Sequence, residues 1–160
     1  MSRVLHTIEP VYNSQSKILI LGSFPSVKSR ENNFYYGHPQ NRFWKVLSSV
    51  FNGDLPVTNE QKKAFLLENH IALWDVIGEC EIEGSADSSI KSVVPNDISA
   101  ILNKTEIKRI YVNGKTAERY YKKYIQNHIG IQAVCLPSTS PANASKTLEA
   151  LKEEWKVITY

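Results

Sequence analysis

The sequence lacks the features that would place it in a membrane or outside the cell. It has no stretch approaching the roughly 18 consecutive apolar residues of a membrane span. Residues 1–17 contain no long apolar segment followed by a small-residue cleavage site, so secretion is not predicted. We therefore expect a cytoplasmic protein with no membrane partner, folded as a single domain over residues 1–160.

Cysteine and histidine are too sparse and too scattered for several kinds of site. Cys80 and Cys135 lie far apart and form no CxxC motif, which argues against a disulfide framework and against an iron–sulfur centre. No spacing typical of metal ligands links the histidines, which are His6, His38, His70 and His128. We expect no metal and no cofactor. The formal net charge of +3 permits a polyanionic partner without requiring one.

Short apolar runs alternate with helix-like segments along the chain. Four runs have strand length, contain β-branched or aromatic residues and are bounded by Gly or Pro: 17–22, 71–78, 107–114 and 131–137. Helical spacing or capping residues predict helices over 41–51, 59–70, 96–104, 114–128 and 142–155, and residues 155–160 are a candidate closing strand. Strands that alternate with helices pair in parallel, which predicts a three-layer α/β/α domain.

Ligands of open α/β sheets bind beyond the carboxyl ends of the strands. In this sequence those ends carry the segments GSFPS (22–26), WDVIG (74–78), NGK (113–115) and LPSTSPAN (136–143). Gly22 permits a close approach of the backbone to a ligand. Phe24 can stack on a planar ligand or fold back onto the core. Asp75 ends a buried run and needs partners, either a ring N–H of a base or nearby backbone amides.

Each of the other polar segments near this edge has two possible roles. Ser138, Thr139 and Ser140 can bind a phosphate, or the segment can form a turn followed by an N-cap of the next helix, Asn143 or Ser145. The segment 85–91, with Asp87, Ser88 and Ser89, is likewise open between phosphate binding and capping. The basic helix face of Lys115, Arg119, Lys122 and Lys123 is either solvated or in contact with DNA, and the spacing of a Walker loop is absent.

The stretch YYGHPQNRFW, residues 35–44, gathers four aromatic rings, a His, an Asn and an Arg. Its continuation GHPQNRFWKVL resembles the HPxNRFW signature of mismatch-specific uracil/thymine glycosylases. Together with LGSFPS, ALWDVIGECEIEGSADSSI and LPSTSPANA, it most resembles the hypoxanthine-DNA glycosylase branch of the uracil-DNA glycosylase superfamily. The resemblance runs from about Ile18 to Ala144, nearly the whole chain.

This resemblance implies a fold and a reaction. The fold is a central four-stranded parallel sheet between helices, with DNA crossing its carboxyl edge. The reaction is hydrolysis of the N-glycosidic bond of a deaminated base, which leaves the duplex and enters a pocket. Since no lysine is clearly placed as an amine nucleophile, we expect a monofunctional enzyme without strand cleavage, acting as a monomer.

The sequence departs from its relatives at several positions. Phe24 stands where mismatch-specific members carry an Asn that positions water, and the Asp-Pro-Tyr turn of uracil-specific members is absent. Residues 136–143 contain neither the Leu nor the Arg that fills the gap left by a flipped base, so Thr139 or Pro141 are the candidates for that role. These departures fit the hypoxanthine branch, in which the Asn that matches Asn41 is implicated in activity.

The resemblance also assigns roles to residues. Asn41 is the candidate catalytic residue, although it can equally cap the helix predicted over 41–51. Tyr35 or Tyr36 would supply an aromatic surface, while Phe43 and Trp44 belong to the helix core. The predicted base pocket is Gly22, Ser23, Phe24, Tyr36, His38 and Asp75. The predicted contacts to the DNA backbone are Ser26, Arg42, Ser88, Ser89, Asn113, Lys115, Ser138, Thr139, Ser140 and Asn143.

Hypoxanthine presents O6 as a hydrogen-bond acceptor and N1–H as a donor. A backbone N–H of residues 22–26 can address O6, and Asp75 can accept from N1–H. Adenine reverses this pattern and would leave buried groups unpaired. Three alternatives remain at this point: the same chemistry on uracil or mismatched thymine, a binding module of this fold without catalysis, and an unrelated small-molecule α/β enzyme.

Overall fold

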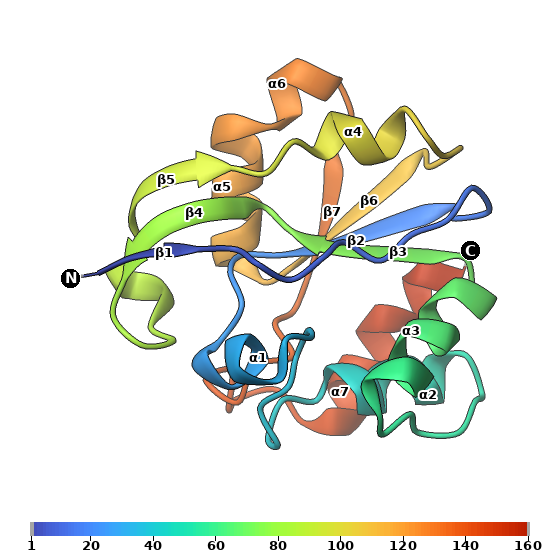
Figure 1. Ribbon diagram of the computed structural model, residues 1–160. Coiled ribbons are helices and arrows are strands. Elements are labelled where there is room, and N and C mark those ends of the chain that lie inside the picture. Colours follow the sequence, from blue (N-terminus) through green and yellow to red (C-terminus); the bar gives the residue numbers. More distant parts are fainter. Residues whose placement is uncertain (1, 160) are drawn as a thin grey trace.

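The computed structural model describes residues 2–159, and a four-stranded sheet runs through its centre (Figure 1). All neighbouring strands of this sheet pair in parallel, in the order β3 (Ile71–Asp75), β2 (Ile18–Gly22), β6 (Arg109–Asn113) and β7 (Ala133–Leu136). The prediction of a three-layer α/β/α fold around a four-stranded parallel sheet is confirmed.

Strand β2 shows why the sheet is covered on both faces. Ile18 and Ile20 belong to one cluster of buried apolar side chains, and Leu19 and Leu21 belong to the other. Successive side chains of a strand point to opposite faces, so a continuous apolar run requires an apolar layer on each side. This requirement is why the run 17–22 reads as a central strand.

Helices form the two outer layers (Figure 1). One layer, which packs on the first cluster, contains α2 (Phe43–Val50), α3 (Asn59–Glu68) and α7 (Leu148–Trp155). The other layer, which packs on the second cluster, contains α4 (Ile98–Leu102), α5 (Lys115–Tyr124) and α6 (Gln126–Ile129). Helix α1 (Val27–Asn32), which the sequence patterns did not predict, follows the turn after β2.

Local chemistry sets the helix ends. Thr58 caps α3 with its side chain on the backbone N–H of Gln61, whose own side chain accepts from the backbone N–H of Thr58. Helix α7 begins six residues later than predicted, with Thr147 as its N-cap, because residues 142–147 form turns instead. The helix predicted over 114–128 is divided at Ile125 into α5 and α6.

A second, antiparallel sheet was not predicted. It consists of β1 (Ser2–Leu5), β4 (Ile77–Ile82) and β5 (Lys91–Pro95), in the order β1-β4-β5. A short 3₁₀ helix connects β4 to β5. The prediction of one strand over 71–78 is therefore wrong: β3 ends at Asp75 and β4 starts a new sheet two residues later. Val76 joins them, and its N–H donates to the carbonyl of Gly22. The chain thus leaves one sheet for the other directly beside Asp75.

The chain end also differs from the prediction. Residues Lys156–Thr159 form a 3₁₀ helix and not a closing strand. The hydroxyl of Thr159 donates to the carbonyl of Lys156, and Ile158 is buried against the first cluster. Val157 and Ile158 therefore pack against the first cluster without belonging to a strand.

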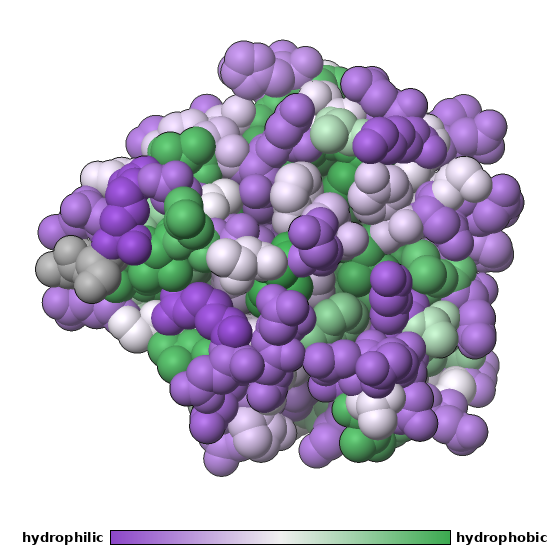
Figure 2. Space-filling view, in the orientation of Figure 1, coloured by the Kyte–Doolittle hydropathy of each residue, from purple (hydrophilic) through white to green (hydrophobic). Residues whose placement is uncertain are grey.

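The surface is mainly polar in the view of Figure 2, with smaller hydrophobic patches, some of them over β1 and β5. Leu5 and Val94 are exposed large apolar residues of this region. Within residues 2–159, no helix has the length and apolar character needed to cross a membrane.

Candidate active site

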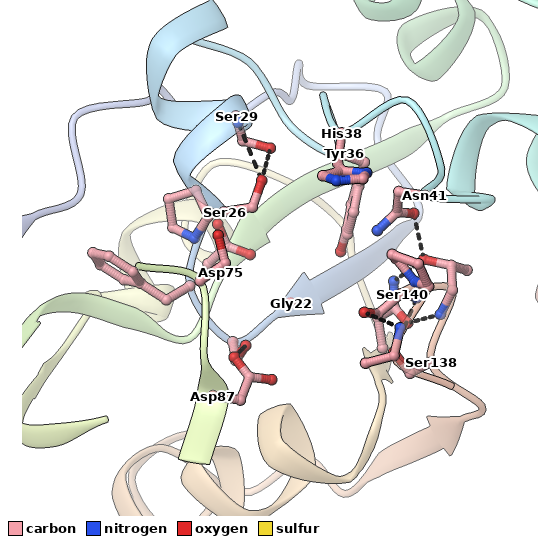
Figure 3. Close-up of a pocket in the computed structure, with 18 of the residues that line it drawn as sticks. Gly22, Ser26, Ser29, Tyr36, His38, Asn41, Asp75, Asp87, Ser138 and Ser140 are labelled. Carbon is pink, nitrogen blue, oxygen red and sulfur yellow. Dashed lines mark hydrogen bonds between the residues drawn. The ribbon is translucent and has the colours of Figure 1, made fainter. Parts of the chain in front are cut away.

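A cavity of about 610 Å³ lies where the four parallel strands end. Gly22 ends β2, Asp75 ends β3 and Asn113 ends β6, while Ser138 follows β7, and all four line the cavity. The volume falls within the range of roughly 300–1,000 Å³ that small-molecule pockets occupy. The convergence expected at the carboxyl edge of the sheet is therefore present (Figure 3).

Most of the residues proposed from the sequence come together here. Those that line the cavity are Gly22, Ser23, Phe24, Ser26, Tyr36, His38, Asn41, Asp75, Ser88, Asn113, Ser138, Thr139 and Ser140. Four do not line it, namely Arg42, Ser89, Lys115 and Asn143. The lining also contains residues that the sequence patterns did not single out for a role, among them Ser29, Ala86 and Ala142.

Gly22 lies against two polar groups of the cavity, the carboxylate of Asp75 and the hydroxyl of Tyr36. A Cβ atom at this position would lie 2.5 Å from Oδ1 of Asp75 and 2.8 Å from Oη of Tyr36. Real Cβ atoms do not approach other atoms so closely, so no side chain fits unless both groups move. The glycine is required by space and not by its backbone conformation, since its φ is not positive.

One side of the cavity, which we call the Asn41 wall, consists of Asn41, Asn113 and Thr139. Thr139 is fully buried; its hydroxyl accepts from Nδ2 of Asn113 at 3.0 Å and donates to Oδ1 of Asn41 at 2.9 Å. The backbone N–H of Thr139 donates to Oδ1 of Asn113 at 3.1 Å. The Asn41 wall is thus a closed hydrogen-bond chain that links the end of β6 to the start of α2.

The side chain of Asn41 has only one possible orientation in this chain. Its Oδ1 also accepts the backbone N–H of Phe43 at 2.9 Å, and a backbone N–H can only donate. Nδ2 therefore has no partner among residues 2–159 and is directed into the cavity (Figure 3). The expected helix cap is modified: Arg42 occupies the N-cap position, yet Asn41 still satisfies the first helical N–H.

Arg42 braces the Asn41 wall from behind. Its guanidinium donates to the carbonyls of Ser140 and Asn143, each at 3.0 Å, and to that of Lys146. Its backbone N–H donates to the carbonyl of Thr139. Because these carbonyls occupy the guanidinium, the structure corrects the predicted phosphate contact of Arg42: the residue holds the loop 138–146 in place. Thr139, being fully buried, is likewise part of the scaffold and not a DNA contact.

The opposite side, which we call the Asp75 wall, consists of Asp75, His6 and Phe24. Nε2 of His6 lies 2.8 Å from Oδ2 of Asp75, and the two side chains are only 2% and 5% exposed. Oδ1 of Asp75 has no protein partner among the described residues and lies beside Gly22. The partner of Oδ2 is thus the side chain of His6, directly after β1, which the sequence did not predict, and Oδ1 is left facing the cavity.

Phe24 combines the two readings given to it by the sequence. It is 8% exposed and belongs to the second apolar cluster, but it also lines the cavity. The guanidinium of Arg30 lies over its ring, 5.7 Å from the centroid. The ring is therefore fixed by the core on one side and presents part of its surface to the cavity.

Tyr36 carries a buried hydroxyl that has no hydrogen-bond partner among residues 2–159. The residue has a positive φ of 53°, and its ring stacks on Phe43 with centroids 4.0 Å apart. Burial, together with the nearby Asp75 carboxylate, raises the pKa of the Tyr36 hydroxyl far above its ordinary value, against a smaller opposing effect of Asn113. The hydroxyl is thus a protonated donor near the Asp75 wall. The hydroxyl of Tyr35, by contrast, already donates to the carbonyl of Glu9 at 2.8 Å.

The segment 85–89 borders the cavity on the side of the second sheet. The hydroxyl of Ser23 donates to Oδ1 of Asp87 at 3.2 Å, and the backbone N–H of Val27 donates to Oγ of Ser85. Partial desolvation of the Asp87 carboxyl raises its pKa, while hydrogen bonds from Ser23 and Thr116 oppose the rise. Ser88 lines the cavity, but the Ser89 hydroxyl is used within the turn, which favours capping for that residue.

Helix α1 and the loop after it complete the rim. Ser26 caps α1 through the backbone N–H of Ser29, and Oγ of Ser29 accepts the backbone N–H of Gly37 at 2.9 Å. Nδ1 of His38 accepts from the backbone N–H of Gln40. These bonds hold the loop that carries Tyr36 and His38 against α1, and leave both residues on the cavity lining (Figure 3).

Lys115 and Asn143 stand away from the cavity lining. Lys115 is exposed at the first turn of α5. Nδ2 of Asn143 donates to the carbonyl of Ser138, and its backbone N–H donates to the carbonyl of Ser140, so the residue shapes the loop 138–146. Ser138 and Ser140 are bonded to each other through Oγ and N–H and remain on the lining.

The cavity therefore offers polar groups of opposite hydrogen-bonding sense. The Asn41 wall presents a free donor, Nδ2 of Asn41, and the Asp75 wall presents a free acceptor, Oδ1 of Asp75. Within residues 2–159, no group of three or more His, Cys, Asp or Glu side chains is arranged to hold a metal ion. A planar polar ring with both an acceptor and an N–H would match this arrangement.

Comparison with known proteins agrees with the geometry. The family model described as "Uracil DNA glycosylase superfamily" matches residues 9–160. A protein of Methanosarcina barkeri named hypoxanthine DNA glycosylase is 36% identical over 148 residues, covering 91% of this chain and 92% of its own. A protein of the same name from Methanosarcina acetivorans is 35% identical over 152 residues, covering 92% and 93%.

A solved structure is also similar. The solution NMR structure of a Methanosarcina acetivorans protein assigned as a uracil DNA glycosylase superposes with a TM-score of 0.81 and 32% sequence identity. The match covers 95% of this chain and 94% of that one. The similarity thus includes the sheet, the helices and the segments that form the cavity.

Proposed function

The chain belongs to the uracil-DNA glycosylase superfamily, and from this premise we propose that it is a monofunctional DNA glycosylase. It hydrolyses the N-glycosidic bond of a deaminated base in DNA, with hypoxanthine favoured, as the first step of base excision repair. The names of the two Methanosarcina relatives support hypoxanthine as the base. Residues 1–160 would act as one domain, as a monomer, in the cytoplasm.

The observation that carries this proposal is that one free donor and one free acceptor face the same cavity. Nδ2 of Asn41 and Oδ1 of Asp75 both face a cavity large enough for a base, and the protein itself satisfies the other atom of each side chain. Buried polar groups are rarely left without a partner, so a free one on a cavity lining is a candidate contact for a ligand.

Hypoxanthine fits these groups through its own polar edge. Oδ1 of Asp75 would accept N1–H, and O6 would accept from a backbone N–H of residues 22–26 or from the unpartnered hydroxyl of Tyr36. Adenine presents an acceptor at N1 and a donor at the exocyclic position, which would place like groups against each other. Leaving such buried groups unpaired discriminates strongly between otherwise similar bases.

The chemistry requires little beyond this arrangement. As the bond from C1′ to the base breaks, positive charge develops on the sugar and negative charge on the base. A fixed donor such as Nδ2 of Asn41 stabilises an acceptor that gains charge, or holds a water by its oxygen, and it does so best where bulk water is excluded. Water then adds to C1′ and its proton leaves with the base. None of the residues that line the cavity is a lysine, which supports hydrolysis without strand cleavage.

The rim supplies groups for the DNA backbone. Ser26, Ser88, Ser138 and Ser140 line the cavity and would contact phosphates on either side of the extruded nucleotide. Lys115, exposed at the start of α5, would add a weaker electrostatic contact that salt screens. The net charge of +3 is consistent with a polyanionic substrate.

A base-release assay tests the proposal. Matched duplexes that carry hypoxanthine, uracil, xanthine or a thymine mismatch are incubated with excess protein, and abasic sites are revealed by alkali. Release of hypoxanthine faster than of the other bases, with intact strands before alkali, is expected. Preferential release of uracil or thymine would assign the other branch of the superfamily. Binding without release would assign a non-catalytic module, and no DNA binding at all would overturn the proposal.

A further inference from the structure

His6 lies outside every sequence segment that carries the resemblance and outside the residues matched by the family model, which begin at residue 9. It follows β1 directly, and its backbone N–H donates to the carbonyl of Gly78 at 2.8 Å, which extends the pairing of β1 with β4. The antiparallel sheet therefore delivers a side chain to the carboxyl end of the parallel sheet. That side chain contacts Asp75, a residue 69 positions away along the chain.

The ring of His6 is held by three aromatic neighbours. Phe24 and Trp74 meet it edge to face, with centroids 6.0 Å and 6.3 Å away, and Tyr35 lies tilted at 6.1 Å. With a side chain that is 2% exposed, the imidazole has little freedom to turn. Nε2 is consequently fixed at 2.8 Å from Oδ2 of Asp75.

This contact determines what Asp75 offers to the cavity. A carboxylate has two equivalent oxygens, and a donor fixed on one of them leaves the other as an acceptor with a set direction. Without that donor, the carboxylate, which is 5% exposed, would lose the contact that fixes its orientation. The oxygen that faces the cavity would then no longer be directed toward the N1–H of the base.

We infer that His6 is a positioning residue for base recognition: its imidazole keeps Asp75 an oriented hydrogen-bond acceptor for the N–H of the extruded base. This inference rests on the proposed glycosylase function and extends it to His6, the residue that directly follows β1. His6 itself does not line the cavity, and it acts through Asp75.

Two substitutions separate hydrogen bonding from packing. His6→Gln keeps an N–H donor of comparable reach, whereas His6→Phe keeps an aromatic ring of similar shape and removes the donor. Loss of a buried hydrogen bond to a charged group predicts that His6→Phe lowers the single-turnover rate of hypoxanthine release about ten- to a hundredfold. DNA affinity should stay within about twofold, since the rim serines are untouched, and His6→Gln should restore most of the rate.

Controls define the outcome that contradicts the inference. His128→Phe, at an exposed position of α6, should leave the rate unchanged. In an Asp75→Asn background, His6→Phe should cause no further loss, because the partner it orients is already altered. Equal activity of His6→Phe and wild type, or a lower rate for His6→Gln than for His6→Phe, would overturn the positioning role. Thermal unfolding of each variant checks folding; if His6→Phe does not fold, the His6→Gln rate and its coupling to Asp75→Asn decide.

The failure of this inference differs from the failure of the proposed function. If the wild-type protein releases no base from any duplex, the glycosylase proposal fails before His6 is tested. If wild type releases hypoxanthine and both His6 variants release it at the wild-type rate, only the positioning role of His6 is contradicted.

Discussion

The Asn41 wall and the Asp75 wall solve the same problem in opposite senses. In Asn41 and in Asp75, the protein binds one polar atom of the side chain, and the other polar atom faces the cavity. The Asn41 wall uses neutral groups, Thr139 and Asn113, and exposes a donor. The Asp75 wall uses an imidazole and a carboxylate and exposes an acceptor. The comparison teaches that two differently built sides of one pocket can present groups of opposite hydrogen-bonding sense.

The largest effects are expected from removing the donor of the Asn41 wall. Asn41→Asp keeps an oxygen for Phe43 and Thr139 but replaces Nδ2 by a second acceptor, while Asn41→Ala removes both. Loss of one preorganised donor predicts a fall in single-turnover base release of about 10²–10³-fold for both variants. Near wild-type release by Asn41→Asp would show that Asn41 serves through its oxygen, as a helix cap only. DNA affinity by fluorescence anisotropy should change much less than the rate.

The Asp75 wall and the neighbouring Tyr36 are disturbed together by a methyl group at Gly22. Gly22→Ala places a Cβ 2.5 Å from Oδ1 of Asp75 and 2.8 Å from Oη of Tyr36, so these groups must shift. Misplacement of reacting groups by about 1 Å can cost about a hundredfold in rate, and we expect a loss of that size. Gly53→Ala, whose methyl would meet the Phe65 ring and no cavity residue, is the matched control. Similar rates for the two variants would argue against the close approach at Gly22.

A smaller effect is expected from loosening the Asn41 wall without touching Asn41. Thr139→Val removes the hydroxyl that links Asn113 to Asn41 and leaves Nδ2 of Asn113, a partly buried donor, without this partner. The cost is about 1–3 kcal/mol of folding stability, and the freed Asn41 amide should lower base release about tenfold. Thr139→Ser retains the hydroxyl and should stay close to wild type in both measurements. Equal rates for valine and serine would show that Asn41 needs no such orientation.

The smallest effect concerns the rim. Asp87 has a raised pKa, so folding is most favoured when this carboxyl is protonated, and that contribution is lost as pH rises through its folded pKa. Asp87→Asn should therefore raise the unfolding temperature slightly at pH 7. The difference should fade as the pH falls below the ordinary pKa of 3.8. Removing a negative charge from the rim should also tighten DNA binding about two- to fivefold at low salt. Weaker binding by the variant would indicate that Asp87 contacts DNA as an acceptor.

The parallel sheet was predictable because its strands are continuous apolar runs between Gly and Pro, as residues 17–22 show. The second sheet was not, because β4, IGECEI, alternates polar and apolar residues and directly continues the run of β3. Nothing local marks Asp75 as the residue at which the chain changes sheets. Only the pairing of strands distant in sequence reveals that change.

The candidate site was predictable to a similar depth. Gly22 and Asp75 sit at strand ends, where topology brings them together, and the HPxN motif places Asn41 just before α2. The sequence could not show which atoms remain free, because that depends on contacts such as Thr139 with Asn41. Arg42 was expected at a phosphate because its charge is visible in the sequence, whereas the carbonyls that occupy it are not. No local sequence pattern marks His6 as a site residue, and only the pairing of β1 with β4 brings it to Asp75.

The most direct test compares two bases on one pair of proteins. Wild type and Asp75→Asn are assayed for release of hypoxanthine and of unsubstituted purine, which lacks both O6 and N1–H, from otherwise identical duplexes. Wild type is expected to prefer hypoxanthine strongly. In Asp75→Asn, whose carbonyl would accept from His6 and whose amide would face the cavity, that preference should fall about ten- to a hundredfold. An unchanged ratio between the two bases, or no base release by wild type, would contradict the account.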